Sequence, residues 1–149
     1  MVAKKPETPE SLDQRALAFA QVREAHQTET AEDYVEMIAD LIEQTGEARV
    51  IDLARYFGVA HATVSKIITR LNKEGYVINR PYRSLFLTDK GKDLALKCKK
   101  RHDIVYNFLR ALNVKSEIAH LDAEGIEHHV SDETLKAFAK LTDQITRKK

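Results

Sequence analysis

A pair of short amphipathic segments around a glycine-containing turn, residues 50–73, constrains the fold of this chain more than any other feature. In the second segment, residues 61–73, apolar side chains recur at i, i+3, i+4 and i+7, which is the spacing of one buried helical face. The first segment, residues 50–57, has the same character, and Gly58 opens the turn. Two short helices joined in this way predict a helix-turn-helix. A helical packing unit that binds no nucleic acid is the alternative.

The second of these helices presents a distinct set of side chains on the side opposite its buried face. Most of them are small hydroxyl or cationic groups, which are the types that bond base edges and phosphates. We therefore predict that this helix contacts DNA. The predicted contact residues are Ala62, Thr63, Ser65, Lys66, Thr69 and Arg70.

Two short β-type runs, residues 76–78 and 85–87, follow this helix and predict a β-wing. The turn between them, residues 79–84, is basic and contains a proline. Arg80 and Arg83 near its tip are predicted to bind DNA phosphates. Solvated turn residues without a partner are the alternative for these two arginines.

Helical periodicity continues on both sides of this unit. Residues 30–45 carry an apolar stripe that ends before Gly46, and a separate short helix with Ser11 as its N-cap is expected over residues 11–25. A long helix is expected from residue 89 to about residue 112, basic in its first half and apolar in its second. Ser116 and Ser131 are expected to cap two further helices, at residues 117–129 and from residue 132 onward.

These elements predict a mainly α fold, in which a winged helix-turn-helix DNA-binding domain is followed by an α-helical dimerisation domain. We assign residues 1–29 to an N-terminal arm, residues 30–95 to the DNA-binding domain and residues 96–149 to the helical domain. Charge is also segregated along the chain: residues 24–59 hold nine acidic and two basic side chains, whereas residues 60–110 hold twelve basic and four acidic ones. A basic middle segment favours a polyanion as partner.

The compartment is indicated by cysteine usage and by the absence of long apolar runs. Cys98 is the single cysteine, so no internal disulfide can form, which fits a reducing compartment. The first residues hold no apolar run of signal-peptide length, and no stretch approaches the roughly 18–20 apolar residues of a membrane span. We therefore expect a cytoplasmic protein that does not contact a membrane.

The stretch AEGIEHHV, residues 123–130, places two carboxylates and two imidazoles within six positions. On a helix, Glu124, Glu127 and His128 stand at i, i+3 and i+4 and share one face, which suits a metal site but also an ordinary solvated helix. The order E-x-x-E-H matches neither zinc-protease motif, and no paired E-x-x-H motif of a di-iron bundle is present. We find no enzyme signature and expect no small-molecule substrate.

From residue 32 to about residue 134 the chain resembles the manganese-sensing branch of the DtxR family of metalloregulators. The resemblance rests on EDYVEMI, on the helix-turn-helix with its VSK, on YRSLFLTDKGK, on RHDIVYNFL and on DAEGIEHHVS. It covers about two thirds of the chain and implies a DNA-binding protein whose helical domain binds metal and forms a homodimer.

The resemblance also implies a set of metal ligands, carried over position by position. In the iron-sensing relatives, methionine takes the place of Asp33 and cysteine that of Glu124, whereas here both are carboxylates, as in the manganese branch. Four carboxylates and two imidazoles without a thiolate suit Mn²⁺ or Fe²⁺. Two ions per subunit are expected by resemblance. The implied ligands are Asp33, Glu36, His102, Glu124, Glu127 and His128.

The sequence thus predicts a Mn²⁺-dependent transcriptional regulator, a repressor of manganese-uptake genes that binds double-stranded operator DNA. An iron-responsive repressor of the same family is the nearest alternative. A metal-binding or metal-buffering protein whose helix-turn-helix does not bind DNA is the alternative from another class.

Overall fold

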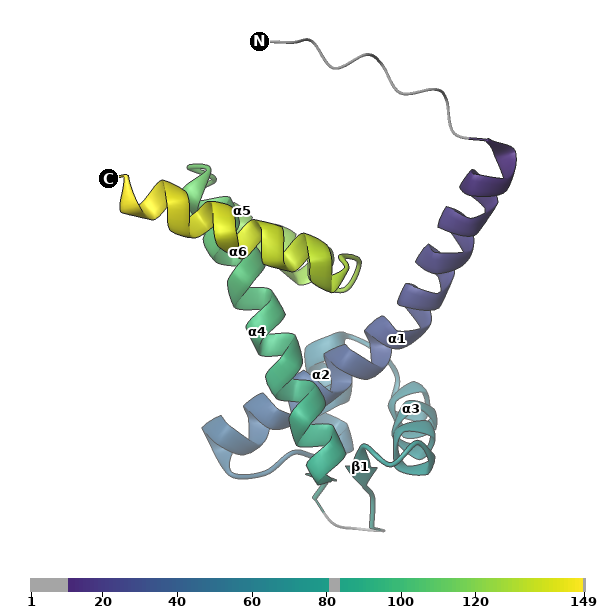
Figure 1. Cartoon of the computed structure of the whole chain (residues 1–149). Helices are drawn as coiled ribbons and strands as arrows, with labels where there is room; N and C mark the ends of the chain where they lie inside the picture. The colour runs from purple at the N-terminus through teal and green to yellow at the C-terminus, as the bar shows by residue number, and fades with distance from the viewer. Residues whose placement is uncertain (1–10, 81–83, 149) are drawn as a thin grey trace.

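Helix α4 (Asp89–Ala111) crosses the molecule and joins its two hydrophobic cores (Figure 1). The computed structural model describes residues 11–80 and 84–148. Helix α1 (Leu12–Thr45) packs against the N-terminal half of α4, whereas α5 (Ser116–Ile126) and α6 (Asp132–Arg147) pack against its C-terminal half. Among the described residues, no helix is both long enough and apolar enough to cross a bilayer.

The first core belongs to a winged helix-turn-helix, which confirms the predicted fold. Helix α2 (Val50–Phe57) and helix α3 (His61–Lys73) are joined by the predicted turn, in which Gly58 adopts a left-handed φ of 65°. Strands β1 (Val77–Ile78) and β2 (Phe86–Leu87) pair antiparallel and form the wing. Each strand is shorter than the run expected from the sequence. A separate single bridge pairs Leu85, just before β2, with Ala48, just before α2.

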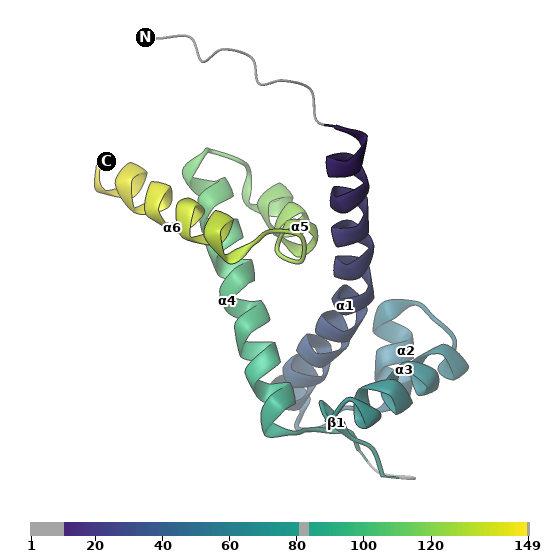
Figure 2. The same ribbon diagram turned by 45° about the vertical axis from the view of Figure 1, so that its right-hand side comes forward.

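The two helices expected at residues 11–25 and 30–45 are a single helix, so the predicted break between them is wrong. Its N-terminus is closed by a capping box between Ser11 and Gln14, and Gly46 ends it in the left-handed conformation. The intervening residues lack an apolar stripe, but they contain neither glycine nor proline, and an exposed helix needs no buried face to continue. Thr28 even directs its hydroxyl to the helical carbonyl of Ala25. From Leu12 onward, the expected arm is therefore part of α1, and its N-terminal half projects from the body of the molecule (Figure 2).

The second core lies where α4, α5 and α6 meet. Val105, Ala123 and Leu135 are buried there, and the rings of Phe108 and Phe138 stack at 4.1 Å between centroids. Ser131 caps α6 as predicted, through a hydrogen bond from the amide of Thr134.

Helix α5 departs from the sequence prediction at both ends. Lys115, not Ser116, is its N-cap residue, and the hydroxyl of Ser116 lies 3.0 Å from that of Tyr106 on α4 instead. The helix ends at Ile126 and is followed by Glu127 and His128, of which Glu127, the C-cap residue, keeps a helical backbone and donates its amide to the carbonyl of Ala123. They lie in the turn that leads to α6, and this turn directs both side chains toward α1 and α4.

Helix α4 meets the wing at very close range. Thr88 caps α4 by accepting a hydrogen bond from the amide of Gly91, and its hydroxyl also donates to the carbonyl of Gly75 at 2.6 Å. A Cβ atom at Gly91 would lie 2.2 Å from the carbonyl oxygen of Tyr76. Only glycine therefore allows the first turn of α4 to pack directly on the backbone that enters β1.

Candidate metal centre

Three separate elements bring the six predicted ligand residues to one place. Asp33 and Glu36 lie about one turn apart on α1, and His102 lies on α4. The remaining three belong to the last turn of α5 and to the residues that follow it. Figure 2 shows how this can happen, because α5 lies in the open side of the V that α1 and α4 form.

Glu127 is at the centre of this arrangement. Nδ1 of His102 lies 3.6 Å from Oε1 of Glu127 and 3.2 Å from Oε1 of Glu124. On the other side, potential ligand atoms of Glu36, Glu127 and His128 all lie within 4.8 Å of one another. Two groups of three possible ligands therefore share the carboxylate of Glu127.

Asp33 completes the cluster from α1. Its Oδ1 lies 3.0 Å from Nε2 of His128, so the DNA-binding domain and the second domain are in direct contact through two predicted ligands. The cleft beside them has a volume of about 460 Å³ and is bordered by Asp33, Glu36, Glu124 and the acidic side chain of Asp40.

The buried polar atoms at this centre lack hydrogen-bond partners. Glu127 has no exposed surface, and neither of its carboxylate oxygens is hydrogen-bonded. Nδ1 of His102 and Nε2 of His128 are buried without a hydrogen bond as well, despite the short distances to neighbouring carboxylates. Unpartnered buried carboxylates and imidazoles are costly, and bound cations would satisfy these atoms. The residues therefore fit a metal ion of the oxygen-preferring class.

The electrostatics of the cluster lead to the same conclusion. Burial raises the pKa of Glu127 to about 8, with further contributions from the carboxylates of Glu36 and Glu124. Burial and the carboxylate of Glu124 likewise raise the pKa of Glu36 to about 7. Burial lowers the pKa of His128, but the carboxylate of Asp33, which lies 3.0 Å from Nε2, and that of Glu32, which is hydrogen-bonded to Nδ1, outweigh it and raise the value to about 10. Without a cation, the cluster therefore retains protons that metal binding has to displace.

Sequence reasoning did not single out Glu32 and Arg101, which hold the cluster in position. Nδ1 of His128 lies 2.6 Å from Oε2 of Glu32, which orients the ring so that Nε2 faces the centre. Arg101 donates to the same oxygen of Glu32, and together Arg101 and His128 keep the pKa of that carboxyl low against the effect of burial. A carboxylate behind a histidine is a common support for a metal ligand. The sequence indicates their role only by position, because Glu32 immediately precedes the predicted ligand Asp33 and Arg101 immediately precedes the predicted ligand His102.

Cys98 does not contribute a thiolate to this centre. It is buried, and its sulfur accepts a contact from Arg101 at 3.6 Å. Burial, together with the negative charge of Glu32 and Glu36, raises its pKa to about 12. The donor set toward a metal therefore consists of oxygen and imidazole nitrogen.

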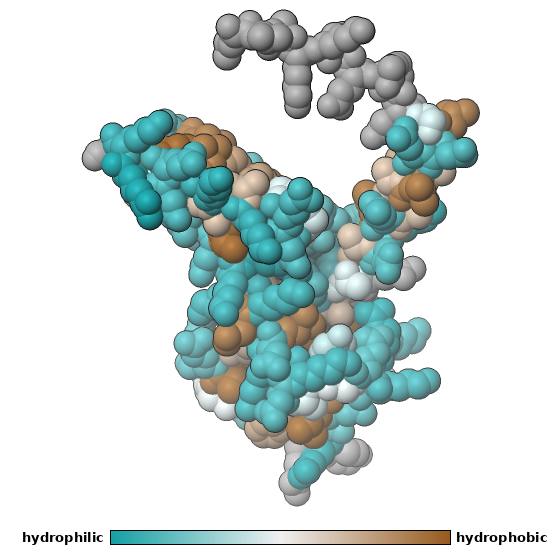
Figure 3. Space-filling view, in the orientation of Figure 1, coloured by the Kyte–Doolittle hydropathy of each residue, from teal (hydrophilic) through white to brown (hydrophobic). Residues whose placement is uncertain are grey.

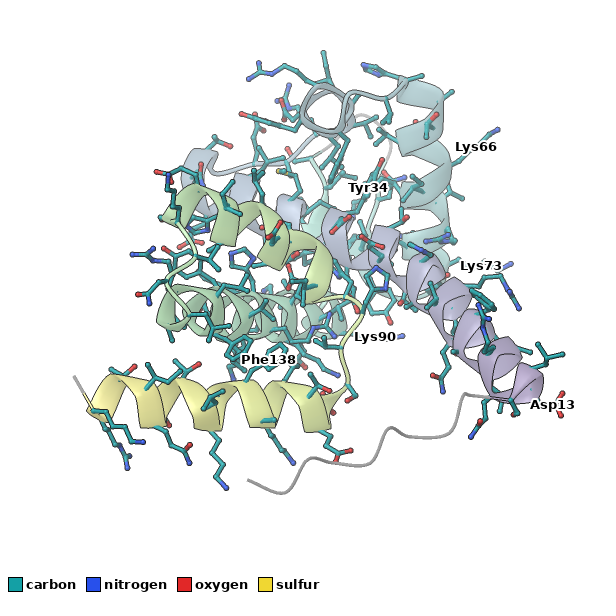
Figure 4. All side chains as sticks on the ribbon, turned by 90° about the horizontal axis from the view of Figure 1, so that it is seen from above. Asp13, Tyr34, Lys66, Lys73, Lys90 and Phe138 are labelled. Atoms are coloured by element: carbon teal, nitrogen blue, oxygen red, sulfur yellow. The ribbon has the colours of Figure 1, made fainter. Side chains whose placement is uncertain are left out.

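The predicted DNA-contact residues on α3 are all exposed, so they are available to a partner. Lys66 points away from the body of the molecule (Figure 4). Arg70 is paired with Glu74 at 3.5 Å, and the hydroxyl of Thr69 donates to the carbonyl of Ser65. Arg80 is exposed on the wing, whereas Arg83 lies outside the described residues.

Comparison with known proteins identifies the same two units. The model of the iron dependent repressor, N-terminal DNA binding domain, matches residues 26–85, and that of the iron dependent repressor, metal binding and dimerisation domain, matches residues 88–149. The transcriptional regulator MntR of Salmonella typhimurium is 49% identical over 134 residues, which cover 90% of this chain and 85% of that protein. The HTH-type transcriptional regulator MntR of Bacillus subtilis is 43% identical over 104 residues, covering 70% of this chain and 73% of the relative.

Solved structures with the same fold come from longer proteins. A manganese-dependent transcriptional repressor in complex with manganese superposes with a TM-score of 0.69 at 30% identity, and the manganese regulator SloR with 0.65 at 29%. The matches cover 76% and 75% of this chain but only 52% and 53% of those chains. The family models together span most of the sequence. The predicted membership is therefore confirmed, and this chain belongs to the iron-dependent repressor family, the DtxR family, alongside its MntR regulators.

Proposed function

We propose that this chain is a Mn²⁺-dependent transcriptional regulator that acts as a homodimer in the cytoplasm and represses manganese-uptake genes. One observation carries the proposal: ligand side chains from both domains converge on the buried, unpartnered carboxylate of Glu127. The absence of a thiolate among them favours a hard cation. The names of the related MntR proteins and of the manganese-dependent repressor support Mn²⁺ in particular.

The proposed switch follows from where the ligands lie. Asp33 and Glu36 belong to the helix that forms the core of the DNA-binding domain, whereas Glu124, Glu127 and His128 belong to the second domain. Two divalent cations held by these residues would supply the positive charge that this cluster lacks. With this charge in place, the carboxylates would no longer repel one another, and their shared binding of the cations would fix α1 relative to α4 and α5. A coupling of about 1–3 kcal/mol between metal and DNA binding is typical of such switches.

The homodimer is expected to form through the helical domain. Residues 104–112 and 135–145 carry apolar faces, part of which, including Phe138, packs inside the chain. Leu112, Leu121 and Leu141 are 49%, 70% and 42% exposed, and apolar patches are visible over this end of the molecule (Figure 3). A dimer through these residues would hold two copies of α3 at a set spacing, and successive major grooves of DNA lie about 34 Å apart.

A mobility-shift titration tests this function directly. Duplex DNA from the promoter of a manganese-uptake gene is titrated with protein in Mn²⁺, Fe²⁺, Zn²⁺ or chelator, beside a scrambled duplex of equal length. We expect Mn²⁺ to strengthen binding to the promoter about tenfold or more relative to chelator, as a coupling above about 1.4 kcal/mol requires. Equal binding in Mn²⁺ and chelator would disprove the switch.

The same titration decides between the proposed function and its alternatives. The ligand set also suits Fe²⁺, so an iron-responsive repressor would respond to Fe²⁺ at lower free concentration than to Mn²⁺. A metal-buffering protein would bind ions but would give no shifted duplex with any of them.

Substitution of Lys66 by alanine is expected to weaken DNA binding without altering metal affinity. Lys66 is exposed on α3 and is not one of the six ligand residues, so its loss removes a cation from the proposed DNA-facing surface only. Loss of one phosphate contact lowers the slope of log K against log salt by about 1. Binding is measured by fluorescence anisotropy at several salt concentrations. Lys136→Ala on α6, which also removes one exposed lysine, should leave the slope unchanged; equal slopes for Lys66→Ala and the unchanged protein would exclude the contact.

A further inference from the structure

A second cluster of possible metal ligands lies beside the first and shares none of its six residues. His26 and Glu29 lie one turn apart on α1, and His129 follows α5. One potential ligand atom from each residue lies within 4.8 Å of the other two. We propose that His26, Glu29 and His129 form a separate binding site for a borderline-soft divalent ion, of which Zn²⁺ is the type.

The distances within this cluster already resemble those of a coordination shell. Oε2 of Glu29 lies 3.2 Å from Nδ1 of His26 and 3.2 Å from Nε2 of His129. In a tetrahedral zinc site with bonds of about 2.0–2.1 Å, neighbouring ligand atoms are separated by about 3.3 Å. Two of the three separations therefore need almost no adjustment. The two rings meet edge to face at 4.9 Å between centroids, so both imidazoles are already held beside the carboxylate.

The chemistry of this trio differs from that of the six-residue centre. Two imidazoles and one carboxylate form a nitrogen-rich set, whereas the first centre is dominated by carboxylates. Imidazole suits zinc, copper, iron and nickel, and three protein ligands leave the fourth position of a tetrahedral zinc ion for water. The side chains of His26, Glu29 and His129 are 63%, 26% and 30% exposed, so an ion can reach them from solvent.

An ion at this site would connect parts of the chain that are far apart in sequence. His26 and Glu29 lie on α1 between its exposed N-terminal residues and Ala31, the first residue of α1 in the first core, and His129 follows α5. The first centre joins the same helix to the same turn a little further along, through Asp33 and His128. Occupancy of the second site would therefore hold the exposed half of α1 against the helical domain.

Zinc stoichiometry tests the proposal in the full-length chain. Protein freed of metal by chelator is dialysed against buffered Zn²⁺, and bound zinc is measured by inductively coupled plasma mass spectrometry. We expect His26→Ala to bind about one Zn²⁺ fewer per chain than the unchanged protein. Alanine favours the helix and His26 is exposed, so this variant should fold. His61→Ala, which removes an exposed histidine from the start of α3, should bind as much Zn²⁺ as the unchanged protein.

A cobalt spectrum supplies a second readout that does not depend on counting ions at the first centre. Tetrahedral Co²⁺ absorbs visible light much more strongly than octahedral Co²⁺. The intense bands should persist in a Glu36→Ala/Glu124→Ala variant and be lost when His26→Ala is added. Equal zinc content in His26→Ala and the unchanged protein would overturn the site. That outcome leaves the manganese-dependent mobility shift unaffected, so failure of this proposal is distinct from failure of the proposed function.

Discussion

Substitution of Glu127 by glutamine is expected to stabilise the metal-free protein and to remove most of its response to Mn²⁺. The unchanged carboxylate is fully buried, has no hydrogen-bond partner and faces the carboxylates of Glu36 and Glu124. Removing its charge relieves that cost, and we expect a gain of about 1–3 kcal/mol at pH 8. The same change deletes the carboxylate shared by both groups of ligands, so Mn²⁺ affinity should fall by about a hundredfold or more.

Two raised pKa values determine how the stability of the metal-free, unchanged protein varies with pH. The pKa of Glu127 is raised from 4.5 to about 8, so its protonated form stabilises the fold below pH 4.5, and this contribution is lost as pH rises through about 8. The pKa of His128 is raised from 6.5 to about 10, and its contribution is likewise lost as pH rises from 6.5 through 10. Stability of the metal-free protein should therefore fall between pH 5 and pH 9, whereas Mn²⁺ affinity should rise as protons leave.

Urea denaturation and Mn²⁺ titration calorimetry at pH 6, 7 and 8 measure both effects. Glu43→Gln is the matched control, because it neutralises an exposed glutamate on α1 that is not one of the six ligand residues and should leave stability and Mn²⁺ affinity nearly unchanged. Glu127→Gln should also show a weaker decline of stability with pH than the unchanged protein. A less stable metal-free variant that still bound Mn²⁺ normally would contradict the central role of this carboxylate.

Substitution of Gly91 by alanine is expected to destabilise the junction between the wing and α4 by about 1–3 kcal/mol or more. The new Cβ would lie 2.2 Å from the carbonyl oxygen of Tyr76, so the backbone has to move. That movement also disturbs the hydrogen bonds from Thr88 to this region. Because α4 connects the DNA-binding domain to the metal centre, DNA affinity in Mn²⁺ should decrease together with stability.

Gly125→Ala is the matched control for this substitution. A Cβ at Gly125 meets no atom within 4 Å, and alanine is favoured over glycine within a helix by up to about 1 kcal/mol. The control should therefore be as stable as the unchanged protein or more so. Thermal unfolding followed by circular dichroism compares the two variants, and equal melting temperatures would show that the junction can relax around the added methyl group.

Local periodicity predicted the helix-turn-helix because both of its helices bury a clear apolar stripe and are separated by Gly58. It failed between residues 25 and 30, where a missing stripe suggested a break although the residues favour an exposed helix. It also could not show that the side chain of Glu127 is fully buried whereas that of Glu124 is 62% exposed. Periodicity indicates burial, and these two features depend on solvent exposure and on tertiary contact.

The complete set of metal-centre residues could be predicted from the sequence only through the family resemblance. The spacing of Glu124, Glu127 and His128 suggested a site, but nothing local connects them to Asp33 or His102, which lie far away in the chain. The supporting pair of Glu32 and Arg101 is more difficult still, because a carboxylate and a guanidinium 69 positions apart have no common sequence pattern. Their role follows from packing of α1 against α4.

Because α1 is one continuous helix, a small tilt near Asp33 would displace its N-terminal end by several ångströms. At about 1.5 Å per residue its 34 residues span about 51 Å, with Asp33 about 32 Å from the N-terminal end. A tilt of about 5° around Asp33 would displace that end by about 3 Å, given the same helical rise. Because one continuous helix carries both Asp33 and the projecting end, a small tilt at the metal centre produces a larger displacement of that end. A spin label there, paired with a second label on α6, would record metal occupancy as a change of distance.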